Sequence, residues 1–189
     1  MGELTETGAE VVDGARQTGA QVVDGARQEA DAYRGDHDRP LGGYVAVMVI
    51  YGAVVVTAVV AALVSGRTLP TRWRAQDLLI VTLGTHKLSR TLTKDAVTSP
   101  LRAPFTRYRG TGGPAEVQEE VRDHSQLRHS LGELLTCPFC LDMWVATGFA
   151  IGLVFAPRFT RLIAGVFSAL TGADFLQLAY ARAQQAAEG

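Results

Sequence analysis

The sequence lacks the features on which several protein classes depend. Only two cysteines occur in 189 residues, so the chain is not a disulfide-dense scaffold. The formal net charge is −1, from 18 Lys and Arg against 19 Asp and Glu, which excludes a strongly basic nucleic-acid-binding protein. The 20 glycines follow no three-residue period, which excludes a collagen-like chain. These absences leave one modest domain or two small ones, with no nucleic-acid partner expected.

The common catalytic signatures are also missing. The sequence contains no phosphate-binding loop, no glycine pattern of dinucleotide-binding proteins and no nucleophile elbow. Its apolar segments hold no paired carboxylates of the kind that transporters use. Ser125, His129 and Ser130 are neighbours in sequence only, which does not make a catalytic triad. No cofactor is therefore expected, and a non-enzymatic role is favoured over an enzyme.

What the sequence does contain is a sharp division into polar and apolar blocks. Residues 44–64 form a run of 21 residues without a charge. A helix of this length rises about 30 Å, which matches the hydrocarbon core of a lipid bilayer. Pro40 precedes the run, and Tyr44 suits the membrane interface. The run predicts a first transmembrane helix within residues 41–66, with the lipid bilayer as the partner of the chain.

Two later apolar runs are weaker candidates for membrane spans. The first covers residues 139–155 and the second covers residues 162–180. Asp142 lies near one end of the first run, where water can reach it. Asp174 lies deeper in the second run and needs a partner or a polar groove, unless that helix is shorter or lies at the interface.

A fourth segment, residues 74–92, is amphipathic and admits two interpretations. Its apolar part is short, and Lys87 and Arg90 follow on the same predicted helix. It either spans the bilayer with these two side chains snorkelling to the interface, which is favoured, or lies along the membrane surface. The sequence therefore predicts an all-α, small multipass membrane protein with three or four transmembrane helices. Residues 94–136 are predicted to be a polar loop with a short charged helix over residues 115–131.

The amino-terminal tail contains an 11-residue duplication. Residues 7–17 read TGAEVVDGARQ and residues 18–28 read TGAQVVDGARQ. Eleven residues fit three helical turns, so this hendecad repeat places Val and Ala on one stripe of an amphipathic helix. Four glycines within the repeat weaken such a helix by about 1 kcal/mol each. A partly disordered tail that folds on a protein partner is therefore the favoured interpretation, and an amphipathic helix is the alternative.

The distribution of basic residues predicts the orientation in the membrane. A dense cluster lies between the second and third apolar segments: Lys87, Arg90, Lys94, Arg102, Arg107 and Arg109. Basic loops are retained in the cytoplasm, so this loop is predicted to be cytoplasmic. With four spans, Arg67, Arg72 and Arg74 lie outside the cell, which contradicts the preference of basic residues for the cytoplasmic side. With three spans, these arginines lie inside and the amino-terminal tail lies outside. Both arrangements put the two cysteines near the cytoplasmic face of a bacterial cell membrane.

One short motif, Cys137-Pro138-Phe139-Cys140, carries intrinsic chemistry. Proline is suited to the first turn of a helix, and a cysteine at a helix amino terminus gains thiolate character. The string resembles a glutaredoxin active site, although the βαβ pattern of that fold is absent, so Cys137 and Cys140 are candidates for redox work. A metal site with His124 and His129 is a second interpretation. The favoured interpretation is structural, with free thiols packed against Leu134 and Trp144 and no permanent disulfide in the cytoplasm.

Two segments resemble a known family. Residues 85–105, THKLSRTLTKDAVTSPLRAPF, and residues 133–146, ELLTCPFCLDMWVA, resemble the uncharacterised bacterial membrane family DUF1360, over about residues 77–155. Phe139 stands where tryptophan is common in that family, and Asp142 stands where a small residue is common. The resemblance implies a small membrane-associated protein without an assigned reaction. Because some members are associated with sporulation, it favours a scaffold or an envelope or sporulation factor.

The resemblance marks four further residues as family-motif positions: Arg90, Asp95, Arg102 and Trp144. Asp95 is expected to pair with a neighbouring arginine and so hold the polar loop against the end of a helix. The predicted organisation of the chain is then a tail (1–40), a first transmembrane helix (41–66), a family core (76–156), a fourth apolar helix (160–181) and a short tail (182–189).

Overall fold

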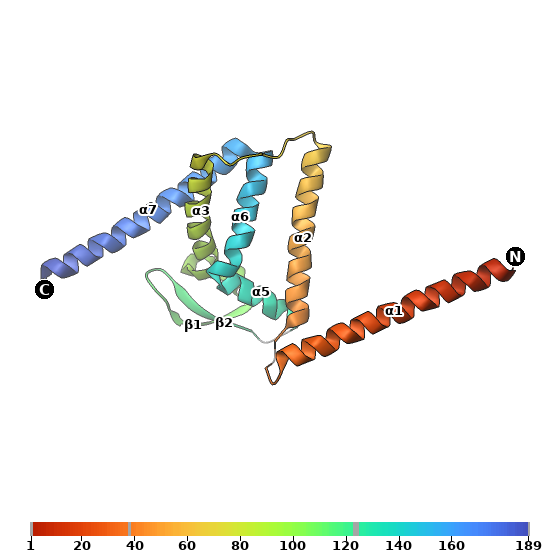
Figure 1. Ribbon diagram of the computed structural model, residues 1–189. Coiled ribbons are helices and arrows are strands. Elements are labelled where there is room, and N and C mark those ends of the chain that lie inside the picture. The colour runs from red at the N-terminus through yellow and green to blue at the C-terminus, as the bar shows by residue number, and fades with distance from the viewer. Residues whose placement is uncertain (1, 38, 123–124, 189) are drawn as a thin grey trace. The chain divides into compact units, whose positions relative to one another are not determined.

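A computed structural model describes residues 2–37, 39–122 and 125–188 of the chain, which is mostly helical (Figure 1). The chain divides into two compact units, Met1–Leu41 and Gly42–Gly189. The first unit is one continuous helix, α1 (Gly2–Arg34), which runs through both copies of the repeat. Ion pairs one turn apart, Asp24 with Arg27 and Asp31 with Arg34, lie on its exposed surface. The tail thus takes the amphipathic-helix alternative rather than the disorder that the glycines favoured.

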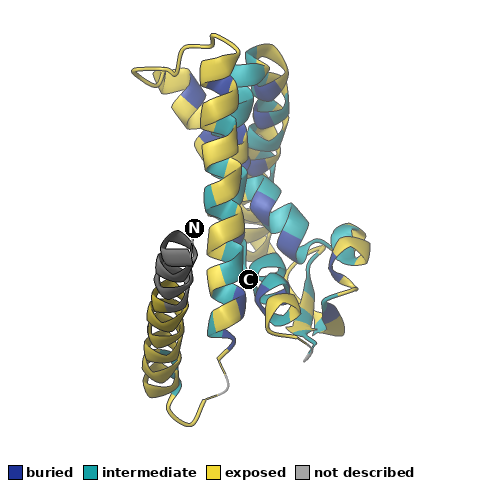
Figure 2. Ribbon diagram, turned by 90° about the vertical axis from the view of Figure 1, so that its right-hand side faces the viewer, coloured by how far each residue is buried: buried dark blue, intermediate teal, exposed yellow. Residues whose placement is uncertain are grey.

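The second unit contains the three predicted apolar helices. They are α2 (Leu41–Val64), α6 (Pro138–Phe155) and α7 (Pro157–Glu188). All three are long and apolar enough to cross a membrane, and most residues of α2 are exposed or of intermediate burial (Figure 2). Pro157 separates α6 from α7, because proline is tolerated in the first turn of a helix but not in its interior. The prediction of an apolar multipass bundle is confirmed at the level of helix length and composition.

A fourth helix, α3 (Ala75–Lys94), packs against both α6 and α7 and stands upright beside α6 (Figure 1). Its own composition is too polar to place it with the three apolar helices. Besides Asp77 and Val81, its buried residues are small or carry a hydroxyl group: Gly84, Thr85, Ser89 and Thr93. A Cβ atom at Gly84 would lie 3.0 Å from the carbonyl oxygen of Ala164, so the backbones of α3 and α7 approach closely.

Hydrogen bonds reinforce this close approach of α3 and α7. The Ser168 hydroxyl donates to the carbonyl of Ile80 at 2.7 Å, and the Thr171 hydroxyl donates to the carbonyl of Leu83 at 2.8 Å. Small residues that allow backbone contact, with hydroxyls that bond across it, are typical of helix pairs inside membranes. Asp174 also finds the partner that the sequence required, because Lys87 Nζ lies 2.8 Å from its carboxylate.

The segment between α3 and α6 differs from the prediction. It contains η1 (Ala96–Thr98), α4 (Ser99–Arg102), strands β1 (Thr106–Thr111) and β2 (Val117–Val121), and α5 (Gln126–Thr136). The strands are antiparallel, with Thr106 opposite Val121 and Thr111 opposite Val117. The helix predicted over residues 115–131 is therefore wrong in its first part. There the chain turns at two glycines and a proline, and β2 pairs with β1. We call residues 95–136 the cap.

The cap lies at the end of the bundle where α3 ends and α6 begins (Figure 1). Gly132 lets α5 approach the hairpin, because a Cβ atom there would lie 2.6 Å from Val121 Cγ1. The start of α2 reaches the same end, since a side chain at Gly43 would collide with Gln126 of α5. The opposite end of the bundle carries the α2–α3 connection, residues 65–74, and the turn between α6 and α7. The cap thus joins three helix ends and positions the cysteine motif among them.

Candidate functional site

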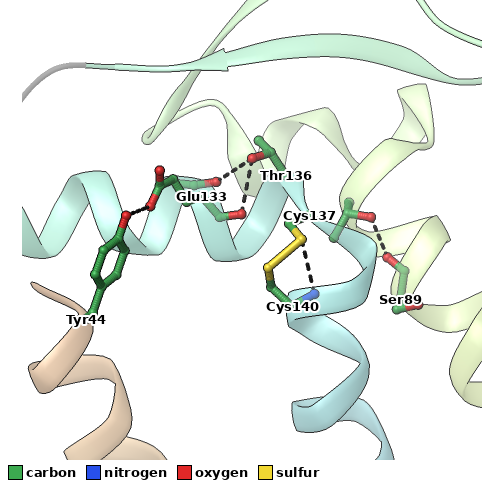
Figure 3. The surroundings of a disulfide bond; sticks show 8 residues. Tyr44, Ser89, Glu133, Thr136, Cys137 and Cys140 are labelled. Carbon is green, nitrogen blue, oxygen red and sulfur yellow. Dashed lines mark hydrogen bonds between the residues drawn. A yellow bond between two sulfur atoms is a disulfide. The ribbon is translucent and has the colours of Figure 1, made fainter. Parts of the chain in front are cut away.

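The cysteine motif forms the sharp turn between α5 and α6 (Figure 3). Cys137 has an extended backbone conformation, with φ −108° and ψ 106°, and it both ends α5 and precedes α6. Pro138 occupies the first turn of α6, as predicted. The Cys140 N–H donates to Cys137 Sγ at 3.2 Å, and the Leu141 N–H donates to the Cys137 carbonyl at 3.1 Å. Cys137 therefore acts as the amino-terminal cap of α6, with its sulfur among the free N–H groups of the first turn.

The two cysteines are joined in a disulfide, and their Cα atoms are 5.2 Å apart. That separation lies within the ordinary range for disulfides. Cys140 is exposed and Cys137 is half-buried. The favoured expectation of two free thiols shielded from solvent is therefore wrong. The expectation failed because sequence spacing permits a disulfide without showing whether the turn brings the sulfurs together.

The surroundings of the disulfide leave one side open. Phe139, between the two cysteines, is 85% exposed. Trp144 is turned toward α2, where its ring meets that of Tyr51 edge-on at a centroid distance of 5.2 Å. Behind the turn, the Tyr44 hydroxyl of α2 donates to Glu133 of α5. The helices thus hold the back of the motif, whereas Phe139 and Cys140 face outward.

The structure gives no support to a metal site at this motif. His124 lies outside the described residues, and His129 Nε2 lies 3.6 Å from a carboxylate oxygen of Glu133. Both sulfurs are committed to the disulfide. Among the described residues, no group of three His, Cys, Asp or Glu side chains is close enough to hold a metal ion.

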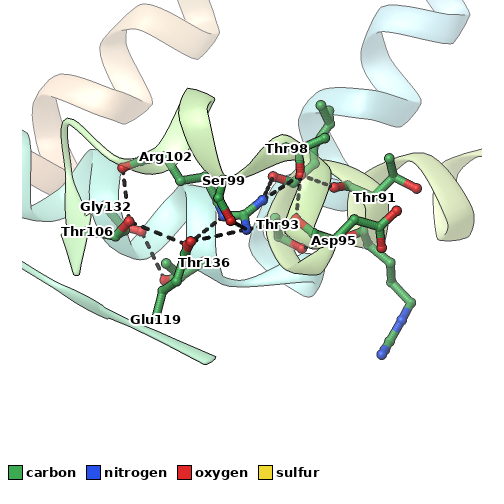
Figure 4. A network of polar contacts seen from close by, with 12 residues as sticks. Thr91, Thr93, Asp95, Thr98, Ser99, Arg102, Thr106, Glu119, Gly132 and Thr136 are labelled. Atoms are coloured by element: carbon green, nitrogen blue, oxygen red, sulfur yellow. Dashed lines mark hydrogen bonds and ion pairs between the residues drawn. The ribbon is translucent and has the colours of Figure 1, made fainter. Parts of the chain in front are cut away.

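Among the described residues, the most buried charge lies in the cap beside this turn. Arg102 is 0% exposed, and its Nε and Nη2 atoms donate to the two carboxylate oxygens of Glu119 at 2.6 and 3.2 Å (Figure 4). Its remaining N–H groups donate to the carbonyls of Leu92 and Asp95 at 2.8 and 3.0 Å, and to nearby hydroxyls. The guanidinium therefore satisfies carbonyls at the carboxyl end of α3, where the helix dipole favours a positive charge. Arg102 links α3, α4 and the hairpin through one side chain.

The predicted role of Asp95 is wrong. Its carboxylate forms no ion pair with a described basic residue, and Arg102 uses its backbone carbonyl instead. Arg90 pairs with Glu116 at 2.5 Å, and Glu116 also forms a β-bridge with Asp95. The loop is held against the helix end as expected, but by two glutamates of the hairpin. The sequence carried no signal for these partners, because Glu119 is 17 residues from Arg102 and only the strand pairing brings them together.

A second polar pair lies at the opposite end of the bundle. Arg161, in the first turns of α7, donates to both carboxylate oxygens of Asp77 in the first turn of α3, at 2.7 and 2.8 Å. This pair joins residues 84 positions apart, so no local pattern could have indicated it.

Two cavities lie along α6. One, of about 510 Å³, lies between α2 and α6 and reaches the Asp77–Arg161 pair. The other, of about 580 Å³, lies between α3 and α6 and is lined by Thr85 and Asp142. One side-chain oxygen of each of these residues is buried without a hydrogen-bond partner. Asp142 was expected to face water at a helix end. Instead, one of its carboxylate oxygens lies inside the bundle.

The comparisons with known proteins give a family and no activity. The family model described as "Protein of unknown function (DUF1360)" matches residues 80–180, more than half of the chain. The match covers most of α3, the whole cap, α6 and much of α7. No curated protein and no solved structure matched the chain.

Proposed function

The chain belongs to the DUF1360 family, and on that premise we propose that it is an integral membrane protein whose Cys137–Cys140 disulfide exchanges with a protein dithiol at the cytoplasmic face. The observation that carries the proposal is the disulfide itself, closed at the amino terminus of α6 with Cys140 exposed. A disulfide in the cytoplasm is typically transient and redox-active rather than permanent.

The proposed membrane arrangement has four crossings. The composition of α2, α6 and α7 supports three of them. The packing of α3 supports the fourth, because its small buried side chains and its Lys87–Asp174 pair are what a polar helix needs inside a bilayer. Four crossings place the cap and the connection at residues 65–74 on opposite sides. The basic residues of the cap favour its cytoplasmic placement.

The proposed exchange begins with attack on the exposed sulfur. A thiolate of the partner dithiol attacks Cys140 Sγ, forms a mixed disulfide and breaks the Cys137–Cys140 bond. The electron pair of that bond leaves on Cys137 Sγ, where the Cys140 N–H and the amino terminus of α6 stabilise the thiolate. A better-stabilised leaving thiolate departs faster, which favours this direction of attack.

The second thiol of the partner completes the reaction. Its thiolate attacks the partner sulfur of the mixed disulfide and releases Cys140 as a thiolate. Two electrons have then passed from the partner dithiol to this protein: the partner is oxidised to a disulfide, and Cys137 and Cys140 are reduced to thiols. The open side of the motif at Phe139 and Cys140 gives the partner access.

The test uses the full chain in membrane vesicles and a small dithiol protein of the thioredoxin class as the probe. We expect glutathione buffers of cytoplasmic redox poise to open the disulfide reversibly, as measured by alkylation and mass spectrometry. A Cys137→Ser variant, first converted by oxidised glutathione to its Cys140–glutathione disulfide, should accumulate a mixed disulfide with a probe that keeps only its attacking cysteine. The probe thiolate displaces glutathione from the exposed Cys140, and neither protein then has a second thiol that could break the new bond. The Cys140→Ser variant should accumulate less, and the double variant none.

Two results would overturn the exchange proposal. One is a disulfide that stays closed in the folded protein at every cytoplasmic poise. The other is equal trapping by the two single variants. Either result would make the disulfide structural and return the protein to the scaffold, envelope or sporulation role that the sequence favoured.

A further inference from the structure

A cavity lies between α2 and α6, and a polar contact bounds it at either end. At one end of the cavity, near the middle of both helices, the hydroxyls of Tyr51 and Thr147 are 2.8 Å apart. At the other end, Arg67 Nη1 donates to the carbonyl of Val154 at 3.0 Å, and its guanidinium lies 5.5 Å from the centroid of the Phe155 ring. Between these contacts, α2 presents Val55, Ala58, Val59 and Ala62 to the cavity. The volume of about 510 Å³ lies within the usual range of ligand-binding pockets.

The lining of this cavity is apolar along the helices and cationic at one end. Val55, Ala58 and Ala62 line it from α2, and Ile151 lines it from α6. The connection at residues 65–74 closes its end with basic and aromatic side chains. The lining there includes Arg72, Trp73, Arg74, Asp77 and Arg161.

The charges at that end do not cancel. Asp77 neutralises Arg161 through two hydrogen bonds. Arg72 and Arg74 are exposed, and neither guanidinium forms a hydrogen bond or ion pair with another described residue. Two positive charges therefore remain at the mouth of an apolar cavity beside Trp73, a residue type that favours the lipid headgroup region.

We propose that this cavity binds one anionic glycerophospholipid, with an acyl chain between α2 and α6 and the phosphate beside Arg72 and Arg74. The apolar walls match the chain, and the unpaired arginines match the negative headgroup. A neutral or zwitterionic lipid would fill the same apolar volume but would leave both positive charges uncompensated. This site is separate from the disulfide, because it lies at the opposite end of α6.

The test is native mass spectrometry of the detergent-solubilised full chain, titrated with phosphatidylglycerol or with phosphatidylcholine of the same acyl chains. We expect one phosphatidylglycerol to bind preferentially. The double variant Arg72→Ala/Arg74→Ala should weaken its binding by roughly 30-fold, to the level of phosphatidylcholine. Arg107→Ala, which removes an exposed arginine of the cap, serves as the control and should bind normally.

A second pair of variants tests the apolar part of the site. Ala58→Trp should fill the cavity and abolish tight phosphatidylglycerol binding, whereas Ala61→Trp, on the exposed face of α2, should not. Equal affinity for the two lipids, or full binding by the double arginine variant, would overturn the proposal. Competition by inorganic phosphate alone would also overturn it, because the site would then recognise a free anion rather than a lipid.

Discussion

At the scale of single residues, the cap depends on one buried ion pair. Arg102 is fully buried and Glu119 is 6% exposed, so neither charge has water as an alternative partner. A buried pair of this kind contributes little net stability compared with apolar residues, but removing one member leaves the other charge uncompensated. The geometry is favourable, because the guanidinium and the carboxylate meet through two parallel hydrogen bonds.

Replacing Glu119 with glutamine should therefore destabilise the protein by about 3 to 5 kcal/mol, because Arg102 keeps its charge in a buried place. The neighbouring residue provides a matched control. Glu120 pairs with Arg109 on the surface and is 53% exposed, so Glu120→Gln should change stability by about 0 to 1 kcal/mol. Thermal unfolding of the two variants in the same detergent measures the difference. Equal stability of the two variants would contradict the role assigned to the Arg102–Glu119 pair.

At the scale of elements, the contact between α3 and α7 explains how a polar helix belongs to an apolar bundle. The backbones meet at Gly84 and Ala164, and hydroxyl groups of α7 bond to carbonyls of α3. The amphipathic sequence of α3 allowed two placements, one across the bilayer and one along the membrane surface. The close contact favours the upright placement, because α3 meets the apolar helix α7 along its side from Asp77 to Lys87.

A side chain larger than hydrogen at Gly84 should separate these two helices. We expect Gly84→Val to destabilise the protein by about 1 to 3 kcal/mol through overpacking. Gly148→Val on α6 is the control, since a Cβ atom at Gly148 meets nothing within 4 Å. Both substitutions place a β-branched residue in a helix, so the difference in unfolding temperature isolates the contact. If Gly84→Val is as stable as the control, the close approach of α3 and α7 contributes nothing.

At the scale of the whole molecule, the number of crossings decides where the cap lies. With four crossings, the connection at residues 65–74 and the cap lie on opposite sides of the membrane. With α3 at the surface and only three crossings, both would lie on the same side. Thr68 in the connection and Gly113 in the hairpin turn are exposed and can report on the two regions.

Single cysteines at these positions test the arrangement in a background that carries Cys137→Ser and Cys140→Ser. A membrane-impermeant maleimide should label Thr68→Cys in intact cells and Gly113→Cys only after the cells are opened. Carbonate washing of the membranes should leave every variant in the pellet. Labelling of both positions from the same side would refute four crossings, and release of the protein by carbonate would refute membrane integration.

Much of this molecule followed from the sequence by itself. The helices α2 and α6 were predicted nearly to their ends, because the length and hydropathy of a run are local properties of the sequence. The helix α7 was also predicted, but it extends beyond residues 160–181 at both ends. The place of Pro138 in the first turn of α6 was predicted for a similar reason, since proline restricts only its own neighbourhood. The need of Asp174 for a partner was also predicted, although its partner was not named.

Only the tertiary structure decided the remaining features. The hairpin was not predicted, because the charged composition of its residues is equally compatible with a helix. Its strand pairing brings Glu116 to Arg90 and Glu119 to Arg102. The Cys137–Cys140 disulfide required the backbone conformation of one turn. Hydropathy is summed along the chain, whereas ion pairs, disulfides and cavities depend on where distant segments meet. That is why the sequence determined the long apolar helices, while the partners of the arginines, the state of the cysteines and the cavity beside α2 were decided by packing.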